Sequence, residues 1–121
     1  MDIYSHVALL LEDEPLISMD LELTLGNAGF DVSTVMSCSE AEEWLEICRP
    51  DVVIVDIMLQ DGPATAVVSK LVEAEIPFIV HSGELESQHV GTPLERGLWL
   101  SKPAIAEELV GAAKTLVRKA G

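Results

Sequence analysis

Four short apolar runs of the sequence each lead into a side chain that could take part in chemistry. The most apolar run ends at Asp56, and the first run of the chain leads into Glu12 and Asp13. The two later runs lead into Ser82 and Lys102. Ligands of open α/β sheets bind outside the carboxyl ends of the strands, so these side chains are expected around one point. Carboxylates, a hydroxyl and an ammonium together suit a phosphoryl group that is held with a divalent metal ion.

The elements that would position these side chains alternate along the chain. Runs typical of buried strands cover residues 7–11, 51–56, 76–80 and 98–100, and residues 31–36 alternate apolar and polar side chains as an outer strand would. Apolar residues at helical spacing predict helices over residues 15–28, 39–48, 64–72 and 104–119. Strands that alternate with helices in this way predict a doubly wound α/β fold around a parallel sheet.

Local patterns predict where two of the helices begin and which sides they bury. Ser39 followed by Glu42 has the spacing of a capping box, so the second helix is expected to begin there. Its inward side chains are predicted to be Ala41, Trp44, Leu45 and Cys48. The last helix is predicted to pack on the sheet through Ile105, Leu109, Ala113 and Leu116.

Residues 84–97 hold the one place where a helix could form before the last strand. Gly91, Pro93 and Gly97 interrupt this segment, and such residues break helices. One turn of helix or an irregular loop is therefore expected there.

The composition favours a single soluble domain. A chain of 121 residues with 49% hydrophobic content and only five aromatic residues fits one α/β core built from aliphatic side chains. Its 21 acidic and 7 basic residues give a net charge of −14, which argues against binding to nucleic acid or to an anionic membrane.

The sequence also predicts the location of the protein and the state of its two cysteines. No apolar run approaches the roughly 20 residues that span a bilayer, and residues 1–4 lack the features of a signal peptide. A cytoplasmic location is therefore expected. Cys38 and Cys48 flank the second predicted helix and would stand too far apart for a disulfide, so both are predicted to be free thiols.

The motifs at the strand ends resemble those of the receiver domain of bacterial response regulators. Five features fall in the order of that family, at residues 11–16, 55–59, 61–62, 82–83 and 102–103. The resemblance covers essentially the whole chain, so residues 1–121 are expected to form one stand-alone receiver domain. It implies a five-stranded, flavodoxin-like sheet in the order 2-1-3-4-5, here with a short or irregular fourth helix.

The resemblance also implies a site for Mg²⁺ and a phosphoryl group. Asp56 is similar to the phosphoacceptor of the family, whose carboxylate attacks a phosphohistidine and forms an acyl phosphate. Asp13, Asp56 and the backbone carbonyl of Met58 would bind Mg²⁺, with Glu12 acting through a bound water. Like charges about 4 Å apart cost about 4 kcal/mol at an effective dielectric of about 20, so a divalent cation removes a large obstacle. Oxygen ligands favour Mg²⁺ over Zn²⁺.

Further residues take roles by the same resemblance. Lys102 would hydrogen-bond a phosphoryl oxygen, and its bond to Pro103 is a candidate for the cis form. Ser82 would donate its hydroxyl to the phosphoryl group. Trp99 stands where the family carries an aromatic switch residue, and a partly exposed aromatic over the weak helical segment is the alternative. His81 is expected to pack within the sheet, away from the site.

Four positions depart from the family pattern. Met58 and Glu84 occupy positions that tend to tune dephosphorylation, and an apolar Met58 cannot orient an attacking water. Persistent phosphorylation is therefore expected. Ala104 and Ile105 replace the bulky aromatic and the helix-capping hydroxyl that usually follow the Lys-Pro pair.

The function implied is that of a phosphoacceptor in a two-component or phosphorelay pathway. A sensor histidine kinase or a phosphotransfer protein would be the donor, and the domain would signal by protein contact or act as a phosphate sink. It would catalyse its own phosphorylation and dephosphorylation on Asp56, so its description as an enzyme stays open. The alternative is a pseudo-receiver that binds proteins without being phosphorylated. The acids at residues 12–14 disfavour an FMN protein, and Met58 disfavours an aspartate-nucleophile phosphatase.

Overall fold

Five parallel strands form the central sheet of the structure, a computed structural model that describes residues 5–120. The strands are β1 (His6–Leu11), β2 (Phe30–Val35), β3 (Val52–Val55), β6 (Phe78–Ser82) and β7 (Leu98–Ser101). Their order across the sheet is β2-β1-β3-β6-β7, with every neighbouring pair parallel. This order confirms the flavodoxin-like arrangement expected from the sequence.

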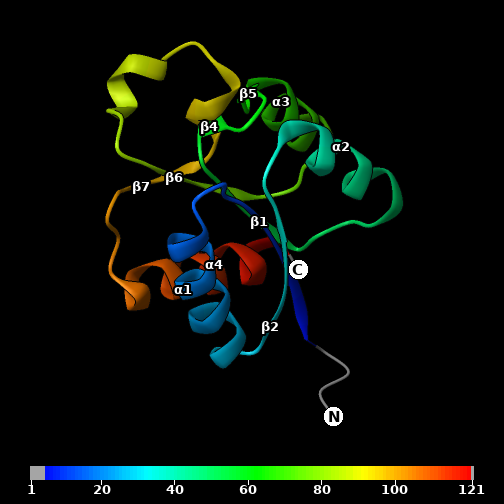
Figure 1. Cartoon of the computed structure of the whole chain (residues 1–121), viewed down its shortest axis with the longest axis vertical. Coiled ribbons are helices and arrows are strands. Elements are labelled where there is room, and N and C mark those ends of the chain that lie inside the picture. The colour runs from blue at the N-terminus through cyan, green and yellow to red at the C-terminus, as the bar shows by residue number, and fades with distance from the viewer. Residues whose placement is uncertain (1–4, 121) are drawn as a thin grey trace.

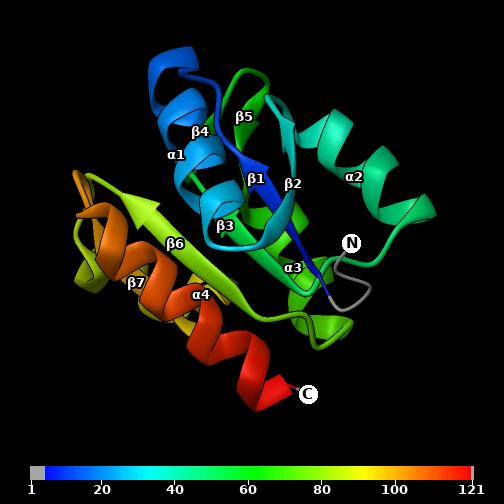
Figure 2. The same ribbon diagram turned by 90° about the horizontal axis from the view of Figure 1, so that it is seen from below.

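The two faces of the sheet are covered by pairs of helices. The helices are α1 (Pro15–Asn27), α2 (Cys38–Ile47), α3 (Thr65–Glu73) and α4 (Ala106–Ala120). Figures 1 and 2 show α1 and α4 on one face and α2 and α3 on the other. Because successive strand residues point to opposite faces, Leu9 and Leu11 pack toward α2 and α3, while Ala8 and Leu10 pack toward α1 and α4. Burial on both faces explains why β1 and β3 are apolar without alternation.

A two-strand hairpin follows β3 and precedes α3. Its strands are β4 (Met58–Leu59) and β5 (Gly62–Pro63), which pair antiparallel. Gly62 has a backbone φ of +128°, a conformation that residues with a Cβ rarely adopt. The hairpin thereby turns the chain within a few residues of Asp56.

The N-cap of helix α2 lies two residues earlier than the sequence predicted. Ser37, not Ser39, is the N-cap: its hydroxyl accepts the backbone N–H of Glu40 at 3.1 Å, and the Glu40 carboxylate accepts the N–H of Met36 at 3.3 Å. The carboxylate of Asp61 accepts the N–H groups of Cys38 and Ser39 at 2.7 and 3.1 Å. The predicted start was wrong because Asp61, on the hairpin, already satisfies the N–H of Ser39.

The shift of α2 also changes what its end buries. The helix ends at Ile47, and Cys48 takes an extended conformation with an exposed side chain, so its predicted burial was wrong. Cys38 and Cys48 are free thiols, as expected. Burial, with the hydrogen bond and charge of Asp61, raises the pKa of Cys38 to about 11. A thiol with that pKa is protonated at neutral pH, which makes it a poor nucleophile.

Helix α4 is likewise offset from its predicted start. It begins at Ala106, and the side chain of Ile105 is 67% exposed, so its predicted inward position was wrong. Leu109, Ala113 and Val117 form the buried row at intervals of four residues. Val117 takes the place that the sequence analysis gave to Leu116, which is half-buried.

The segment between β6 and β7 contains two short 3₁₀ turns. They are η1 (Glu86–His89) and η2 (Pro93–Arg96). The expected short or irregular fourth helix is confirmed. Across residues 5–120 no helix is long and apolar enough to cross a membrane.

Candidate active site

Three carboxylates meet at the carboxyl ends of β1 and β3. Glu12, Asp13 and Asp56 each offer an oxygen, and these oxygens lie within 4.8 Å of one another. Their backbone is fixed by the sheet: Glu12 N–H donates to the carbonyl of Val35 at 3.1 Å, and Asp56 N–H donates to that of Leu11 at 3.0 Å. The apolar runs that lead into acidic residues therefore correctly predicted that these carboxylates lie close together.

The ammonium of Lys102 lies between two of these carboxylates. Its Nζ is 3.1 Å from Glu12 Oε1 and 3.2 Å from Asp56 Oδ2. The Lys102 backbone N–H donates to the carbonyl of Ser82 at 2.8 Å, and the Lys102–Pro103 bond is cis, as the sequence suggested. Burial acts to lower the pKa of Lys102, but the hydrogen bond to Glu12 and the two negative charges outweigh it and raise the pKa.

Glu12 is the most enclosed member of the cluster. Its side chain is 1% exposed, and burial raises its pKa to about 7, with a further rise from its hydrogen bond to Asp56. Lys102 opposes that rise and only partly offsets it. In the metal-free protein near neutral pH, Glu12 therefore holds a proton for part of the time. A divalent cation would displace that proton.

Ser82 ends β6 at the same edge of the sheet. It is 2% exposed, and its Oγ accepts the backbone N–H of Glu84 at 3.0 Å. A hydroxyl that accepts one hydrogen bond still has its own proton to donate. Ser82 can therefore serve a phosphoryl oxygen without losing its contact with Glu84.

The hairpin after β3 carries Met58, a predicted metal ligand, and Asp61, which caps a helix. The side chain of Met58 is 51% exposed, and its backbone pairs with Pro63 across the hairpin. The ligand role of its carbonyl stays a prediction. Asp61 lies outside the acidic cluster and caps α2, and the N–H groups of Cys38 and Ser39 lower its pKa. Sequence reasoning missed this cap, although an aspartate in a turn is a common helix-capping residue.

A second set of side chains links Ser82 to the last strand. His89 Nε2 lies 3.0 Å from Glu84 Oε1, and the His89 ring stacks on Trp99 with centroids 5.6 Å apart. Among the described residues, Trp99 Nε1 is buried without a hydrogen-bond partner. Sequence reasoning missed His89, because only the folded 3₁₀ turns bring it to Trp99.

His81 is buried within β6. Its side chain is 5% exposed, as the alternation of the strand predicted. Burial lowers the pKa of His81, and the charge of Lys102 lowers it further. The ring of His81 is therefore neutral at physiological pH, because a second positive charge next to Lys102 would be unfavourable.

A fold of this kind with acids at these strand ends defines a class of signalling domain, and comparison with known proteins agrees. The chain belongs to the response regulator receiver domain family, whose model matches residues 8–114. It is 30% identical over 117 residues to the transcriptional regulatory protein PrrA of Mycobacterium leprae, which covers 93% of this chain and 50% of PrrA. The chain thus spans about half the length of the curated relatives it matches.

Solved structures show the same fold. A response regulator receiver protein of Sinorhizobium medicae superimposes with a TM-score of 0.84 at 27% identity, covering 97% of this chain and 98% of that one. The receiver domain of a Pseudomonas aeruginosa sensor histidine kinase superimposes with a TM-score of 0.83 at 21% identity, covering 94% and 98%. The latter was solved with a magnesium ion in its active site cleft.

Proposed function

We propose that this chain is the phosphoacceptor of a two-component or phosphorelay pathway and that Asp56 receives the phosphoryl group. One observation carries the proposal: Asp56 lies in a cluster of three carboxylates, and its Oδ2 is 3.2 Å from the ammonium of Lys102. Membership in the receiver family supports the same role. A sensor histidine kinase or a phosphotransfer protein would be the donor.

Asp56 would supply the nucleophile. One of its carboxylate oxygens attacks the phosphorus of a phosphohistidine, the new O–P bond forms as the P–N bond breaks, and the histidine nitrogen keeps the electron pair. Asp13, Asp56 and the carbonyl of Met58 would hold Mg²⁺, with Glu12 behind a water. The donor set fits, because all of these ligands are oxygens. When bound, Mg²⁺ offsets the negative charge of the phosphoryl oxygens.

Lys102 and Ser82 would hold the product. The Lys102 ammonium bridges Glu12 and Asp56 before transfer. After transfer, a phosphoryl oxygen on Asp56 would offer the ammonium another charge-assisted hydrogen bond. The hydroxyl of Ser82 would donate to a second oxygen. These two contacts with phosphoryl oxygens would exist only when Asp56 is phosphorylated.

The donor protein would approach beside α1. Leu16, Met19 and Leu23 of this helix are 83%, 63% and 65% exposed, and Leu16 follows the acidic loop directly. Exposed apolar side chains of this kind suit a protein contact. A cytoplasmic location, with output through protein contact or by draining phosphate, completes the proposal.

A pseudo-receiver that is never phosphorylated is the second candidate function. The complete set of acids, hydroxyl and ammonium favours the phosphoacceptor over it. The two differ in one measurable property, which is whether Asp56 becomes modified.

Labelling by acetyl phosphate with Mg²⁺ tests the proposal. The wild-type chain is expected to gain the mass of one phosphoryl group, and Asp56→Asn to gain none, because an amide is a far poorer nucleophile than a carboxylate. Asp31→Asn is the matched control, since Asp31 is exposed near the opposite end of the sheet. Equal labelling of Asp56→Asn and wild type would place the reaction elsewhere, and no labelling of wild type would favour the pseudo-receiver.

A further inference from the structure

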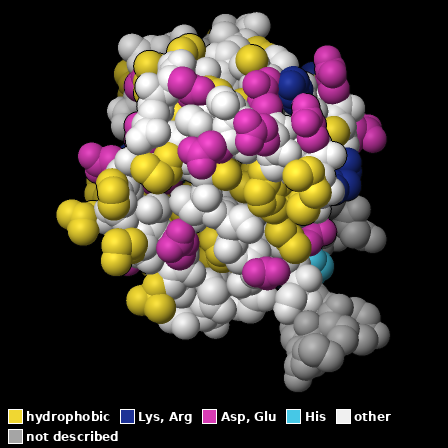
Figure 3. Space-filling view, turned by 45° about the vertical axis from the view of Figure 1, so that its right-hand side comes forward, with side chains coloured by type: hydrophobic (Ala, Val, Ile, Leu, Met, Phe, Trp, Pro, Cys, Tyr) yellow, Lys and Arg dark blue, Asp and Glu magenta, His cyan; other side chains and the backbone are white. Residues whose placement is uncertain are grey.

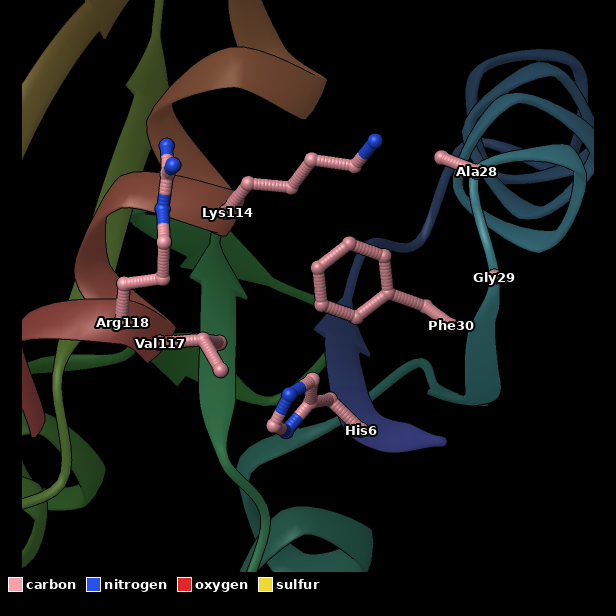
Figure 4. A pocket seen from close by; sticks show the side chains of 7 residues that line it. All are labelled: His6, Ala28, Gly29, Phe30, Lys114, Val117 and Arg118. Atoms are coloured by element: carbon pink, nitrogen blue, oxygen red, sulfur yellow. The ribbon is translucent and has the colours of Figure 1, made fainter. Parts of the chain in front are cut away.

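A hollow at the opposite end of the sheet from Asp56 combines an apolar floor with positive charge. It lies where β1 and β2 begin, against the last turns of α4, and has a volume of about 310 Å³. Its walls include His6, Phe30, Lys114, Val117 and Arg118. Figure 4 shows these side chains around one space, with the ring of Phe30 at its centre.

The floor of the hollow is made of well-packed apolar side chains. Phe30 is 8% exposed and Val117 is 6% exposed, so both are held in the core and present only an edge. The ring of His6 lies 6.5 Å from that of Phe30 at an angle of 46°. Gly29 and Ala28 close the side next to α1 with almost no side chain. This floor can therefore contact a flat apolar group.

The charge of the hollow is opposite to that of the protein. The chain has 7 basic residues against 21 acidic ones, and Figure 3 shows acidic side chains spread over the face that it presents. Lys114 and Arg118 nevertheless both line this hollow. In the described part of the chain, neither has a carboxylate oxygen within 4.0 Å, whereas Lys70 and Lys102 are paired with acids. Within the described residues, both charges are therefore free of an ion pair and available to a ligand.

The helix dipole explains only one of these two cations. Arg118 lies in the last turn of α4, where a positive charge is stabilised by the carbonyl ends of the helix. Lys114 lies six residues before the end of the helix, beyond the reach of that effect. Residues four apart are neighbours on a helix, so the two like charges repel each other slightly. Figure 4 shows Lys114 extended across the hollow toward Ala28.

We propose that this hollow binds a small organic anion. The apolar part of the ligand would rest on Phe30 and Val117, and its carboxylate, sulfonate or phosphate group would lie beside Lys114 and Arg118. His6 is less available, because its Nδ1 lies 3.7 Å from the carboxylate of Asp51. The volume is at the lower limit for ligand pockets, which fits a small aromatic molecule of up to three rings.

The proposal does not depend on the chemistry of Asp56. His6 and Leu11 begin and end β1, so at about 3.3 Å per residue they stand roughly 16 Å apart. Binding to the hollow therefore requires neither Mg²⁺ nor a phosphorylated site. Anions that bind at Asp56 would need the metal ion, and EDTA separates the two.

A fluorescent anion tests the proposal. The probe is 8-anilinonaphthalene-1-sulfonate, titrated in EDTA, with the amide shifts of Gly29 and Phe30 followed by ¹⁵N NMR. We expect saturable binding with shifts at these two amides. Lys114→Glu and Arg118→Glu should each weaken binding about tenfold, from a lost attraction and an added repulsion. Lys119→Glu is the matched control: it makes the same charge change on α4 but does not line the hollow, so less than about a twofold loss is expected.

Three results would overturn the proposal. One is an equal loss in all three variants, which would mean a general effect of net charge. A second is saturable binding without changes in the amide shifts of Gly29 and Phe30. The third is equal binding of N-phenyl-1-naphthylamine, which keeps the rings and lacks the sulfonate. If a charge reversal disturbs folding, Lys114→Gln and Lys119→Gln replace the glutamate variants. They remove the positive charge without adding repulsion, and only Lys114→Gln should weaken binding of the probe.

Discussion

The acidic cluster and the segment over residues 84–97 both follow the carboxyl end of a strand, but they are held in different ways. Glu12 and Asp56 donate their backbone N–H groups to neighbouring strands, and Glu12 is 1% exposed. In residues 84–97, backbone hydrogen bonds join η1 and η2 to their own flanking residues, and Leu94 is the buried anchor. The first region is fixed by the sheet, and the second is held by its own turns and by the packing of η2 on α3, which leaves it more loosely attached to the sheet.

This difference suits two different tasks. Attack by a carboxylate on phosphorus needs reacting groups held in one geometry, which the strand ends provide. A conformational response needs a segment whose rearrangement costs little, and such segments come from the least stable parts of a fold. Ser82 connects the two regions, because it ends β6 and accepts the N–H of Glu84. Chemistry is therefore expected in the first region and a conformational response in the second.

Removing Lys102 should have the largest effect on the fixed region. Lys102→Met leaves the buried Glu12 and the half-buried Asp56 without their cation, and breaking a buried ion pair costs several kcal/mol. Lys102 is partly exposed and Glu12 can take up a proton, so we expect a loss of about 2–3 kcal/mol in the free energy of unfolding at pH 8.

Urea unfolding in EDTA measures that loss. Lys114→Met serves as control, since Lys114 pairs with no acid in the described residues and should change stability by less than about 0.5 kcal/mol. If the two variants lost the same stability, the contacts of Lys102 with Glu12 and Asp56 would contribute nothing particular to the cluster.

The raised pKa of Glu12 predicts an effect of similar size. A folded-state pKa of about 7 against an ordinary value of 4.5 means that the folded protein holds a proton that the unfolded chain releases. The contribution of Glu12 to stability is therefore most favourable below pH 4.5 and is lost as the pH rises to 7. The expected loss between pH 4.5 and 7 is about 3 kcal/mol in metal-free protein, from a pKa difference of about 2.5 at about 1.4 kcal/mol each.

Comparison with Glu12→Gln isolates this effect. The amide does not titrate, so the stability difference between wild type and variant should change across pH 4.5–7 and level off above it. The lowered pKa of His81 acts in the opposite direction, since its contribution is lost as the pH falls, but it is common to both proteins. A difference that stays constant with pH would contradict the proton assigned to Glu12.

A smaller effect is expected where the loosely held segment meets the sheet. A Cβ on Gly97 would lie 2.4 Å from Cε2 and 3.1 Å from the carbonyl oxygen of Phe78, whereas a Cβ on Gly83 would meet nothing within 4 Å. Gly97→Ala should therefore cost about 1–2 kcal/mol of unfolding free energy by overpacking. Gly83→Ala is the control and should be near neutral. Equal values would show that the junction at Gly97 adapts freely.

The sequence predicted the fixed region better than the loosely held one. Apolar runs that end in polar residues predicted the meeting of Glu12, Asp56 and Lys102, because parallel strands bring their carboxyl ends to one edge. The stacking of His89 on Trp99 depends on how two 3₁₀ turns fold back, and no periodicity in the sequence encodes that.

Local patterns also failed where two options were chemically equal. Ser37 with Glu40 and Ser39 with Glu42 both have the capping-box spacing. The choice between them depends on Asp61, more than twenty residues later, whose carboxylate accepts the N–H groups of the first turn. The buried face of α4 was predicted incorrectly for a similar reason. Both Leu116 and Val117 fit the helical spacing, and packing on the sheet buries Val117.

The central claim is that a phosphoryl group in the fixed region rearranges the loosely held one. Beryllofluoride with Mg²⁺ stands in for the acyl phosphate, and in a Trp44→Phe variant Trp99 is the sole remaining tryptophan. Adding the analogue should change the fluorescence of Trp99 and the amide hydrogen exchange of residues 84–97, and it should leave the exchange of β1 and β3 unchanged. Asp56→Asn in the same background should not respond. If the analogue is bound and residues 84–97 and Trp99 stay as they were, the claim is wrong, and a phosphate sink without conformational output becomes the better account.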